Sequence, residues 1–194
     1  TVAIWVSRKS WKAPRRFLLQ RANVKVKSVT SRLLEGRVGL IRLTHFQNST
    51  FDELSQALDA LRRQSKNRLQ ALILDLRANP GGLLDQAVKV ADLFIASGPL
   101  VTTVGFGAKM REPKMATRIG TETALPMVAL IGPSSASASE IVAGALKNHN
   151  RALILGRRSF GKGSVQVIYD NHDDSALKLT IAQYLTPGDL SIQS

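Results

Sequence analysis

The sequence predicts an α/β fold built on a largely parallel sheet. Residues 69–76 and 126–132 are short, nearly all-apolar runs, as expected for strands that are buried on both faces. Between them, apolar residues recur at helical spacing over residues 84–95. Strands and helices that alternate in this way are typical of a sheet whose faces are covered by helices.

The N-terminal part of the chain predicts short strands around a basic turn. Residues 1–6 are apolar, and residues 7–16 are polar and basic. Residues 24–29 alternate with the period of two that is typical of a strand. Residues 38–43, which follow Gly36, predict another strand.

A helix is expected next, because Thr50 and Glu53 match the capping box that starts many helices. Its apolar face would consist of Phe51, Leu54, Leu58 and Leu61. Residues 105–123 predict a loop with weak strands. The remaining expected elements are strands over 100–104, 152–155, 164–169 and 176–185 and a helix over 136–148.

The composition excludes several kinds of chemistry. The 194 residues include no cysteine, which rules out disulfides, thiolate catalysis and cysteine zinc sites. The three histidines, His45, His149 and His172, are scattered without the spacing of a metal site. No apolar run reaches the roughly 18 residues of a membrane-spanning helix. We therefore expect no metal site built on cysteine or histidine and no rival histidine-based triad.

The formal charge of +13 raises nucleic-acid binding as an alternative. Residues 1–37 hold ten Lys and Arg and one acid, whereas residues 38–194 hold 17 Lys and Arg and 13 acids. The excess charge is therefore concentrated in an N-terminal strip, and no nucleic-acid-binding motif accompanies it. We expect a solvated basic face and no nucleic-acid partner. An affinity for nucleic acid that falls steeply with salt would contradict this expectation.

Residues 134–140 read SSASASE and open the helix expected over 136–148. A serine in the first turn of a helix lies at the positive end of the helix dipole, beside unpaired N–H groups that can stabilise an oxyanion. Ser137 lies between two alanines that leave room for a peptide backbone. We therefore consider Ser137 a candidate nucleophile, with helix capping as the structural alternative.

Lys162 is the candidate base, and it lies between two glycines in the run FGKGSVQ at 160–166. A lysine acts as a base only when it is neutral, which desolvation favours, and Phe160 is expected to supply an apolar setting. Gln166 lies four residues later, on the same face if the strand is continuous, where its amide can orient the lysine nitrogen. Such a Ser–Lys pair is a known alternative to the Ser–His–Asp triad. A surface lysine in a turn is the structural alternative.

Residues 79–82 read NPGG and follow the expected strand over 69–76. In α/β proteins the carboxyl ends of strands are where ligand contacts gather. The N–H groups of Gly81 and Gly82 are therefore candidates for an oxyanion hole, although Pro-Gly-Gly is also a common turn. Asp75 is expected to be structural.

Together these segments resemble the carboxyl-terminal processing proteases, also called tail-specific proteases. The resemblance extends from about Val24 to Gln193. It implies an α/β fold with a crotonase/Clp-protease-like β-β-α spiral core in residues 31–194. Residues 1–30 would be N-terminal strands, the remnant of a PDZ domain and a linker. The matching stretches are GLIRL at 39–43, LDLRANPGGLL at 74–84, SASASEIVAGAL at 135–146, FGKGSVQ at 160–166 and LKLTIAQYLTP at 177–187.

The resemblance implies a role for each candidate residue. Some relatives have an Asp eleven residues after the serine, where Asn148 stands in this chain, so the third catalytic member is expected elsewhere. The implied positions are Ser137 as nucleophile, Lys162 as base, Gln166 as third member, and the backbone N–H groups of Ala138, Gly81 and Gly82 as oxyanion donors.

The resemblance implies a serine endopeptidase that cleaves polypeptides near their C-termini without a metal or cofactor. The alternative is a catalytically silent member of the same fold that binds peptides or recruits a partner. The implied partners are polypeptide substrates and a PDZ domain in the parent protein; membrane-associated or adaptor partners and a homo-oligomer stay open. The implied compartment is the periplasm or cell envelope, although this segment shows no signal peptide.

The glycines on either side of Lys162 predict a turn that can move. We therefore expect a resting arrangement in which Ser137 and Lys162 are too far apart for a hydrogen bond. Because the lysine must lose its proton to act, we also expect activity to rise with pH.

Overall fold

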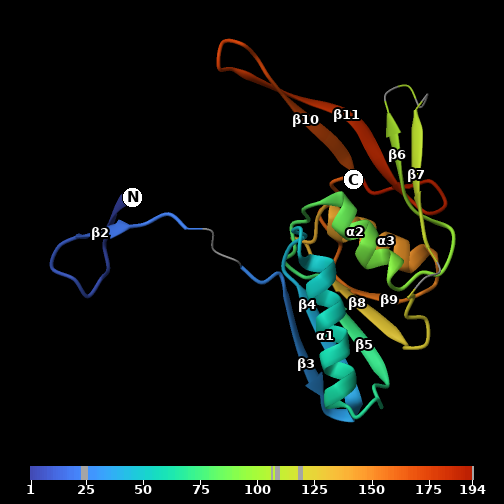
Figure 1. Cartoon of the computed structure of the whole chain (residues 1–194). Coiled ribbons are helices and arrows are strands. Elements are labelled where there is room, and N and C mark those ends of the chain that lie inside the picture. Colours follow the sequence, from blue (N-terminus) through green and yellow to red (C-terminus); the bar gives the residue numbers. More distant parts are fainter. Residues whose placement is uncertain (23–25, 106, 108–109, 118–119, 194) are drawn as a thin grey trace.

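A computed structural model describes residues 1–22, 26–105, 107, 110–117 and 120–193 of the chain. A five-stranded sheet with helices packed against it forms the centre (Figure 1). A second sheet and an N-terminal hairpin extend from this centre (Figure 1). The predicted α/β class is confirmed.

The central sheet has the order β3 (Val29–Leu34), β4 (Val38–Leu43), β5 (Ala71–Asp75), β8 (Met127–Ile131) and β9 (Leu153–Gly156). The last four strands are parallel to one another, whereas β3 pairs antiparallel with β4. β5 lies in the middle of the sheet, with Leu72 and Leu74 fully buried. Burial on both faces is the reason that this run of the sequence is nearly all apolar.

The described residues form three α-helices, α1 (Thr50–Gln64), α2 (Leu84–Asp92) and α3 (Ala138–Asn148), and a 3-10 turn, η1 (Glu35–Arg37). α1 packs on β3 and β4, and α2 packs on α3. The predicted apolar face of α1 is confirmed for Leu54, Leu58 and Leu61, which are buried, whereas Phe51 is half-buried.

The second sheet is antiparallel and separate from the central one. Its order is β10 (Ser164–Asp170), β11 (Ala176–Thr186), β6 (Pro99–Gly105) and β7 (Arg111–Met115), and β12 (Leu190–Ser191) pairs with β11. The sequence located most of these strands, but their local patterns do not reveal which sheet they join. β10 and the first part of β11 project from the core as a two-stranded arm (Figure 1).

The N-terminal segment forms a hairpin of β1 (Val2–Val6) and β2 (Arg15–Leu19). In its basic turn Trp11 stacks on Phe17, and the guanidinium groups of Arg8 and Arg15 lie 4.9 and 4.8 Å from the Trp11 ring centre. Of the strand predicted over 24–29, residues 24 and 25 lie outside the described residues, and β3 begins only at Val29. None of the described helices has the length and apolar character needed to cross a bilayer.

The predicted capping box of Thr50 and Glu53 is wrong. Ser49 is the cap residue of α1. The Glu53 carboxylate accepts hydrogen bonds from the backbone N–H groups of Ser28, at 2.8 Å, and Val29, at 3.1 Å, and from the Ser49 hydroxyl, at 2.7 Å. Glu53 therefore fastens the start of β3 to α1.

Removing the charge of Glu53 is expected to destabilise the fold mainly near neutral pH. Burial raises the pKa of Glu53, but hydrogen bonds from Ser49, Ser28 and Val29 outweigh burial and hold this pKa below its usual 4.5. A carboxyl group with a lowered folded-state pKa stabilises the fold above its unfolded-state pKa and loses that contribution as the pH falls. Thermal unfolding of Glu53→Gln should therefore show a lower Tm at pH 7 and a smaller loss at pH 3.

Asp52→Asn is the matched control, because Asp52 is an exposed acid in the same first turn of α1. Its Tm should stay close to that of the wild type at both pH values. An equal Tm loss for Glu53→Gln at pH 7 and pH 3 would show that the carboxylate charge contributes nothing.

Candidate active site

Ser137 is held in a strained backbone conformation immediately before α3. It has φ 55° and ψ −115°. A positive φ is uncommon for a residue other than glycine, and strain of this kind gathers at functional sites. The turn leaves Ser137 half-exposed at the N-terminus of a helix that is otherwise largely buried.

Hydrogen bonds distinguish Ser137 from its neighbouring serines. The Ser135 hydroxyl donates to the Leu76 carbonyl at 2.7 Å and accepts a backbone N–H. The Ser139 hydroxyl donates to the Asn79 carbonyl at 2.9 Å. Both serines are fully buried, so their side chains hold the turn together. Ser137 is the half-exposed serine at the helix start.

The glycine turn predicted to supply an oxyanion hole lies directly against this serine. A Cβ atom added to Gly81 would lie 2.8 Å from the Ala136 carbonyl oxygen and 3.0 Å from both Ala138 N and Ser137 Cβ. The Ala136 N–H donates to the Asn79 carbonyl at 3.1 Å, which fixes the two turns to each other. Two segments that are more than 50 residues apart in sequence therefore meet here.

The two glycines differ in what their N–H groups can do. The Gly81 N–H donates to the side-chain oxygen of Asn79 at 2.9 Å. It is therefore occupied in this arrangement, and the prediction that it serves as an oxyanion donor requires this bond to open. The N–H groups of Gly82 and Ala138 donate to no acceptor within the described part of the chain, so both remain candidate donors.

Lys162 lies in a loop that is tied to the start of α3, but its side chain is exposed. The Phe160 N–H donates to the Ser135 carbonyl at 2.9 Å. The expected apolar setting is absent, because Phe160 is itself 63% exposed. For the described residues, Lys162 forms a hydrogen bond through its backbone N–H, to Glu140, and none from its side chain to Ser137. This agrees with the expected resting arrangement.

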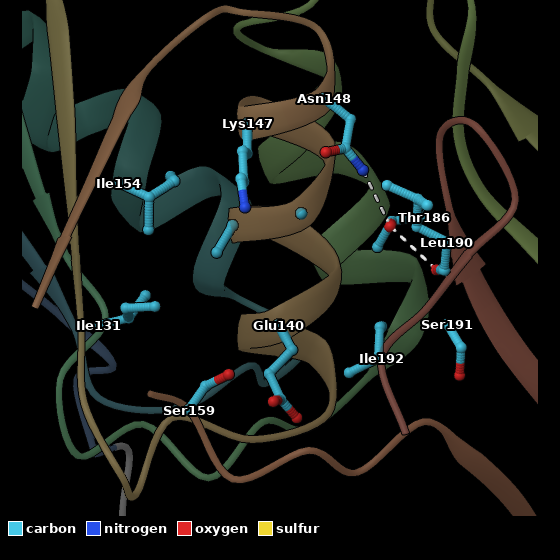
Figure 2. Close-up of a pocket in the computed structure, with 12 residues that line it drawn as sticks. Ile131, Glu140, Lys147, Asn148, Ile154, Ser159, Thr186, Leu190, Ser191 and Ile192 are labelled. Carbon is cyan, nitrogen blue, oxygen red and sulfur yellow. Dashed lines mark hydrogen bonds between the residues drawn. The ribbon is translucent and has the colours of Figure 1, made fainter. Parts of the chain in front are cut away.

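Glu140 is a residue of this site to which the sequence assigned no role. Its carboxylate accepts the backbone N–H groups of Ser137 at 2.8 Å, Gly161 at 2.6 Å and Lys162 at 2.9 Å. Figure 2 shows Glu140 at the start of α3, where it lines a cavity of about 290 Å³ together with Ser159. The available signal was its spacing, since a Glu three residues after a cap serine is typical of a capping box.

Gln166 is not brought to Lys162 by a continuous strand. β10 begins only at Ser164, and a bulge between Val165 and Gln166 shifts the alternation of side chains. The Gln166 amide donates to the Thr180 hydroxyl at 3.2 Å, at an exposed position on the arm. The inference that Lys162 and Gln166 share one strand face is therefore wrong for this arrangement.

Asp75 and Asn148 are engaged in other contacts. Arg77 forms two hydrogen bonds of 2.9 Å to the Asp75 carboxylate. Burial raises the pKa of Asp75, but the hydrogen bonds and charge of Arg77 outweigh burial and lower it. The Asn148 amide donates to the Thr186 hydroxyl, drawn in Figure 2, and to the Pro187 carbonyl, each at 3.0 Å. Both side chains therefore act as structural links, as expected for Asp75.

Comparison with known proteins identifies the family. The model of peptidase family S41 matches residues 37–194, which include the Ser137 turn, the glycine turn and the Lys162 loop. The chain belongs to peptidase family S41. The predicted resemblance to carboxyl-terminal processing proteases is thereby confirmed.

Two curated S41 relatives are similar over most of this chain. A carboxy-terminal-processing protease of Bartonella bacilliformis is 47% identical over 175 residues, which are 88% of this chain and 39% of the relative. A probable CtpA-like serine protease of Staphylococcus aureus is 42% identical over 171 residues, 87% of this chain and 34% of the relative. The chain therefore spans less than half the length of these relatives.

A solved structure shares the fold. The photosystem II D1 C-terminal processing protease superimposes with a TM-score of 0.77 and 31% sequence identity. The superposition covers 99% of this chain and 53% of that protease. The fold of this chain thus has a counterpart in that protease.

Proposed function

We propose that this chain contains the catalytic centre of a serine endopeptidase that cleaves polypeptides near their C-termini. The main support is the strained backbone of Ser137, which lies against Gly81 and directly precedes Ala138, whose N–H group is unbonded in the described part of the chain. The N–H of Gly82, in the same turn as Gly81, is likewise unbonded there. A nucleophile with N–H donors close by is the arrangement that acyl transfer requires. The names of the relatives supply the substrate class.

In the proposed reaction, Ser137 Oγ attacks the carbonyl carbon of the scissile peptide bond, and its proton passes to a neutral Lys162 Nζ. The oxyanion that forms accepts hydrogen bonds from the Gly82 and Ala138 N–H groups. The C–N bond then breaks as Lys162 returns the proton to the leaving amine. Water then attacks the carbonyl carbon of the acyl-enzyme and gives a proton to Lys162 Nζ. The ester C–O bond breaks, and Lys162 returns that proton to Ser137 Oγ.

Lys162 must leave its exposed resting position to take part. Its backbone N–H is already fixed to Glu140 at the start of α3, so the movement required is mainly of its flexible side chain. Gly161, with φ 87°, adopts a backbone conformation that favours glycine. We retain Gln166 as the residue that orients the lysine nitrogen once the Lys162 side chain turns toward Ser137, which requires the Gln166 amide to leave Thr180.

The wider setting of this reaction is also a proposal. Polypeptides are the proposed substrates, captured through a PDZ domain of the parent protein, in the periplasm or cell envelope. A catalytically silent, peptide-binding member of the fold is the second candidate. It is favoured only by the exposed side chain of Lys162, which lacks a bond to Ser137.

Lys162→Arg tests the role of the base, because arginine keeps the positive charge but does not lose its proton at physiological pH. We expect hydrolysis of an unstructured peptide to fall about 10²–10⁴-fold with an unchanged Tm. Wild-type activity should rise with pH because the lysine must be deprotonated.

Lys178→Arg, on the exposed arm, is the control and should retain full activity. Full activity of Lys162→Arg would remove Lys162 as the base. Peptide binding by the wild type without any hydrolysis would favour the silent alternative.

A further inference from the structure

We infer that Glu140 is a positioning residue that holds the nucleophile and the base of the proposed Ser137–Lys162 pair at a fixed separation. This inference rests on the proposed function. It assigns a role to a buried carboxylate that takes no part in the proton transfers, and it predicts that the spacing of the pair depends on one side chain.

The geometry joins the two catalytic segments through a single oxygen atom. Glu140 Oε2 accepts the N–H of Ser137 at 2.8 Å and the N–H of Lys162 at 2.9 Å. The two backbone nitrogens therefore cannot be farther apart than the sum of these two distances. Glu140 Oε1 accepts the N–H of Gly161 at 2.6 Å, which fixes the orientation of the loop as well as its distance.

The chemistry of the site suits a carboxylate. All three partners are N–H donors, and an ionised carboxylate offers two acceptor oxygens and no donor. Glu140 is only 6% exposed, and in a buried setting such charge-assisted bonds are strong and an unpaired N–H is costly. Its negative charge also lies in the first turn of α3, at the positive end of the helix dipole.

The same contacts determine which N–H groups remain for the substrate. Because the N–H of Ser137 donates to Glu140, it is not available to an oxyanion. The adjacent Ala138 N–H stays unbonded in the described part of the chain. Glu140 thus positions the base and selects the donor that faces the reacting carbonyl.

Glu140→Gln separates this positioning role from simple helix capping. Glutamine also forms a capping box, so its amide oxygen can still accept the Ser137 N–H and keep the start of α3 intact. The same amide oxygen can also keep the Lys162 N–H, because one oxygen, Oε2, accepts both groups in the wild type. The NH₂ group then takes the place of Oε1 and faces the Gly161 N–H, donor against donor. The variant should therefore fold, while this repulsion pushes Gly161, and the Lys162 loop with it, away from the start of α3.

We expect kcat for an unstructured peptide to fall about 10²-fold in Glu140→Gln, because a misplacement of about 1 Å costs that much, with KM changed less than twofold. A fluorophosphonate should label Ser137 correspondingly more slowly. Hydrogen exchange at the amides of Gly161 and Lys162 should accelerate, while exchange in the rest of α3 stays protected. The exchange result does not depend on activity.

Glu122→Gln is the matched control. Glu122 is a partly buried carboxylate that also accepts two backbone N–H groups, from Ala124 at 2.9 Å and Leu125 at 3.2 Å. Replacing this carboxylate in Glu122→Gln should lower the Tm without lowering kcat. A kcat for Glu140→Gln within twofold of wild type, or unchanged exchange at Gly161 and Lys162, would overturn the inference.

The two proposals fail in different ways. If Ser137→Ala keeps full activity, the proposed function fails. If Ser137→Ala is inactive but Glu140→Gln is fully active, the function stands and only the positioning role fails. Should Glu140→Gln prove too unstable to assay at 25 °C, its exchange rates and labelling can be compared with those of Glu122→Gln at a lower temperature.

Discussion

Ser137→Ala is expected to abolish peptide hydrolysis while leaving the fold intact. Removing the nucleophile of a serine protease lowers kcat about 10³-fold or more. The activity that remains comes from substrate binding and the oxyanion hole. The Ser137 side chain is half-exposed, so its loss leaves no buried cavity. We expect kcat at the background rate and a Tm within a few degrees of the wild type.

Two neighbouring serines serve as controls for this result. Ser134→Ala changes an exposed serine of the same run and should alter neither activity nor Tm. Ser139→Ala removes the buried hydrogen bond to the Asn79 carbonyl, which should cost about 1–3 kcal/mol of unfolding free energy. Activity retained in Ser137→Ala would remove this serine from the mechanism.

Gly82→Ala is expected to cause the largest combined loss of stability and activity. A Cβ atom at this position would lie 2.1 Å from the backbone oxygen of Phe46, and the φ of +141° disfavours any side chain. The neighbouring backbone is fixed by hydrogen bonds of 2.9 Å from Phe46 N–H to Gly81 and from Leu83 N–H to Phe46. The turn must shift, and the Gly82 N–H shifts with it.

We expect roughly 2–4 kcal/mol of lost stability, a Tm lower by roughly 5–15 °C, and a kcat lower by about 10²–10³-fold at a temperature where the variant is folded. Gly36→Ala is the control, because Gly36 also has a positive φ, +68°, but nothing lies within 4 Å of an added Cβ. It should keep full activity. A fully active Gly82→Ala would exclude this turn from the oxyanion hole.

The sequence predicts the central sheet and its helices well because their signals are local. An apolar run identifies β5, and the spacing of Leu54, Leu58 and Leu61 identifies α1. The assignment of β6, β10 and β11 to a separate sheet depends on pairing between distant strands. Propensity and periodicity say nothing about such pairing, so this part of the architecture was not predictable.

In the candidate site, too, features with a local sequence signal were predictable and tertiary contacts were not. Ser137 and the glycine turn stand out through residue type and position, and the structure brings them into contact. The acceptor of the Gly81 N–H is set by the conformation of its own turn. The loop partners of Glu140, Gly161 and Lys162, are set by tertiary contacts across 21 and 22 residues. The error on Gln166 came from a β-bulge, which shifts the side-chain alternation without a clear sequence signal.

Mapping a covalent adduct tests the central claim most directly. The purified protein is treated with a biotinylated fluorophosphonate, digested, and analysed by mass spectrometry, with Lys162→Arg and Ser137→Ala treated in parallel. The account predicts one adduct, on Ser137, in the wild type, a much slower reaction at Ser137 in Lys162→Arg, and none in Ser137→Ala. An adduct on another serine, or equal labelling of Ser137 in the wild type and Lys162→Arg, would contradict the proposed Ser–Lys pair.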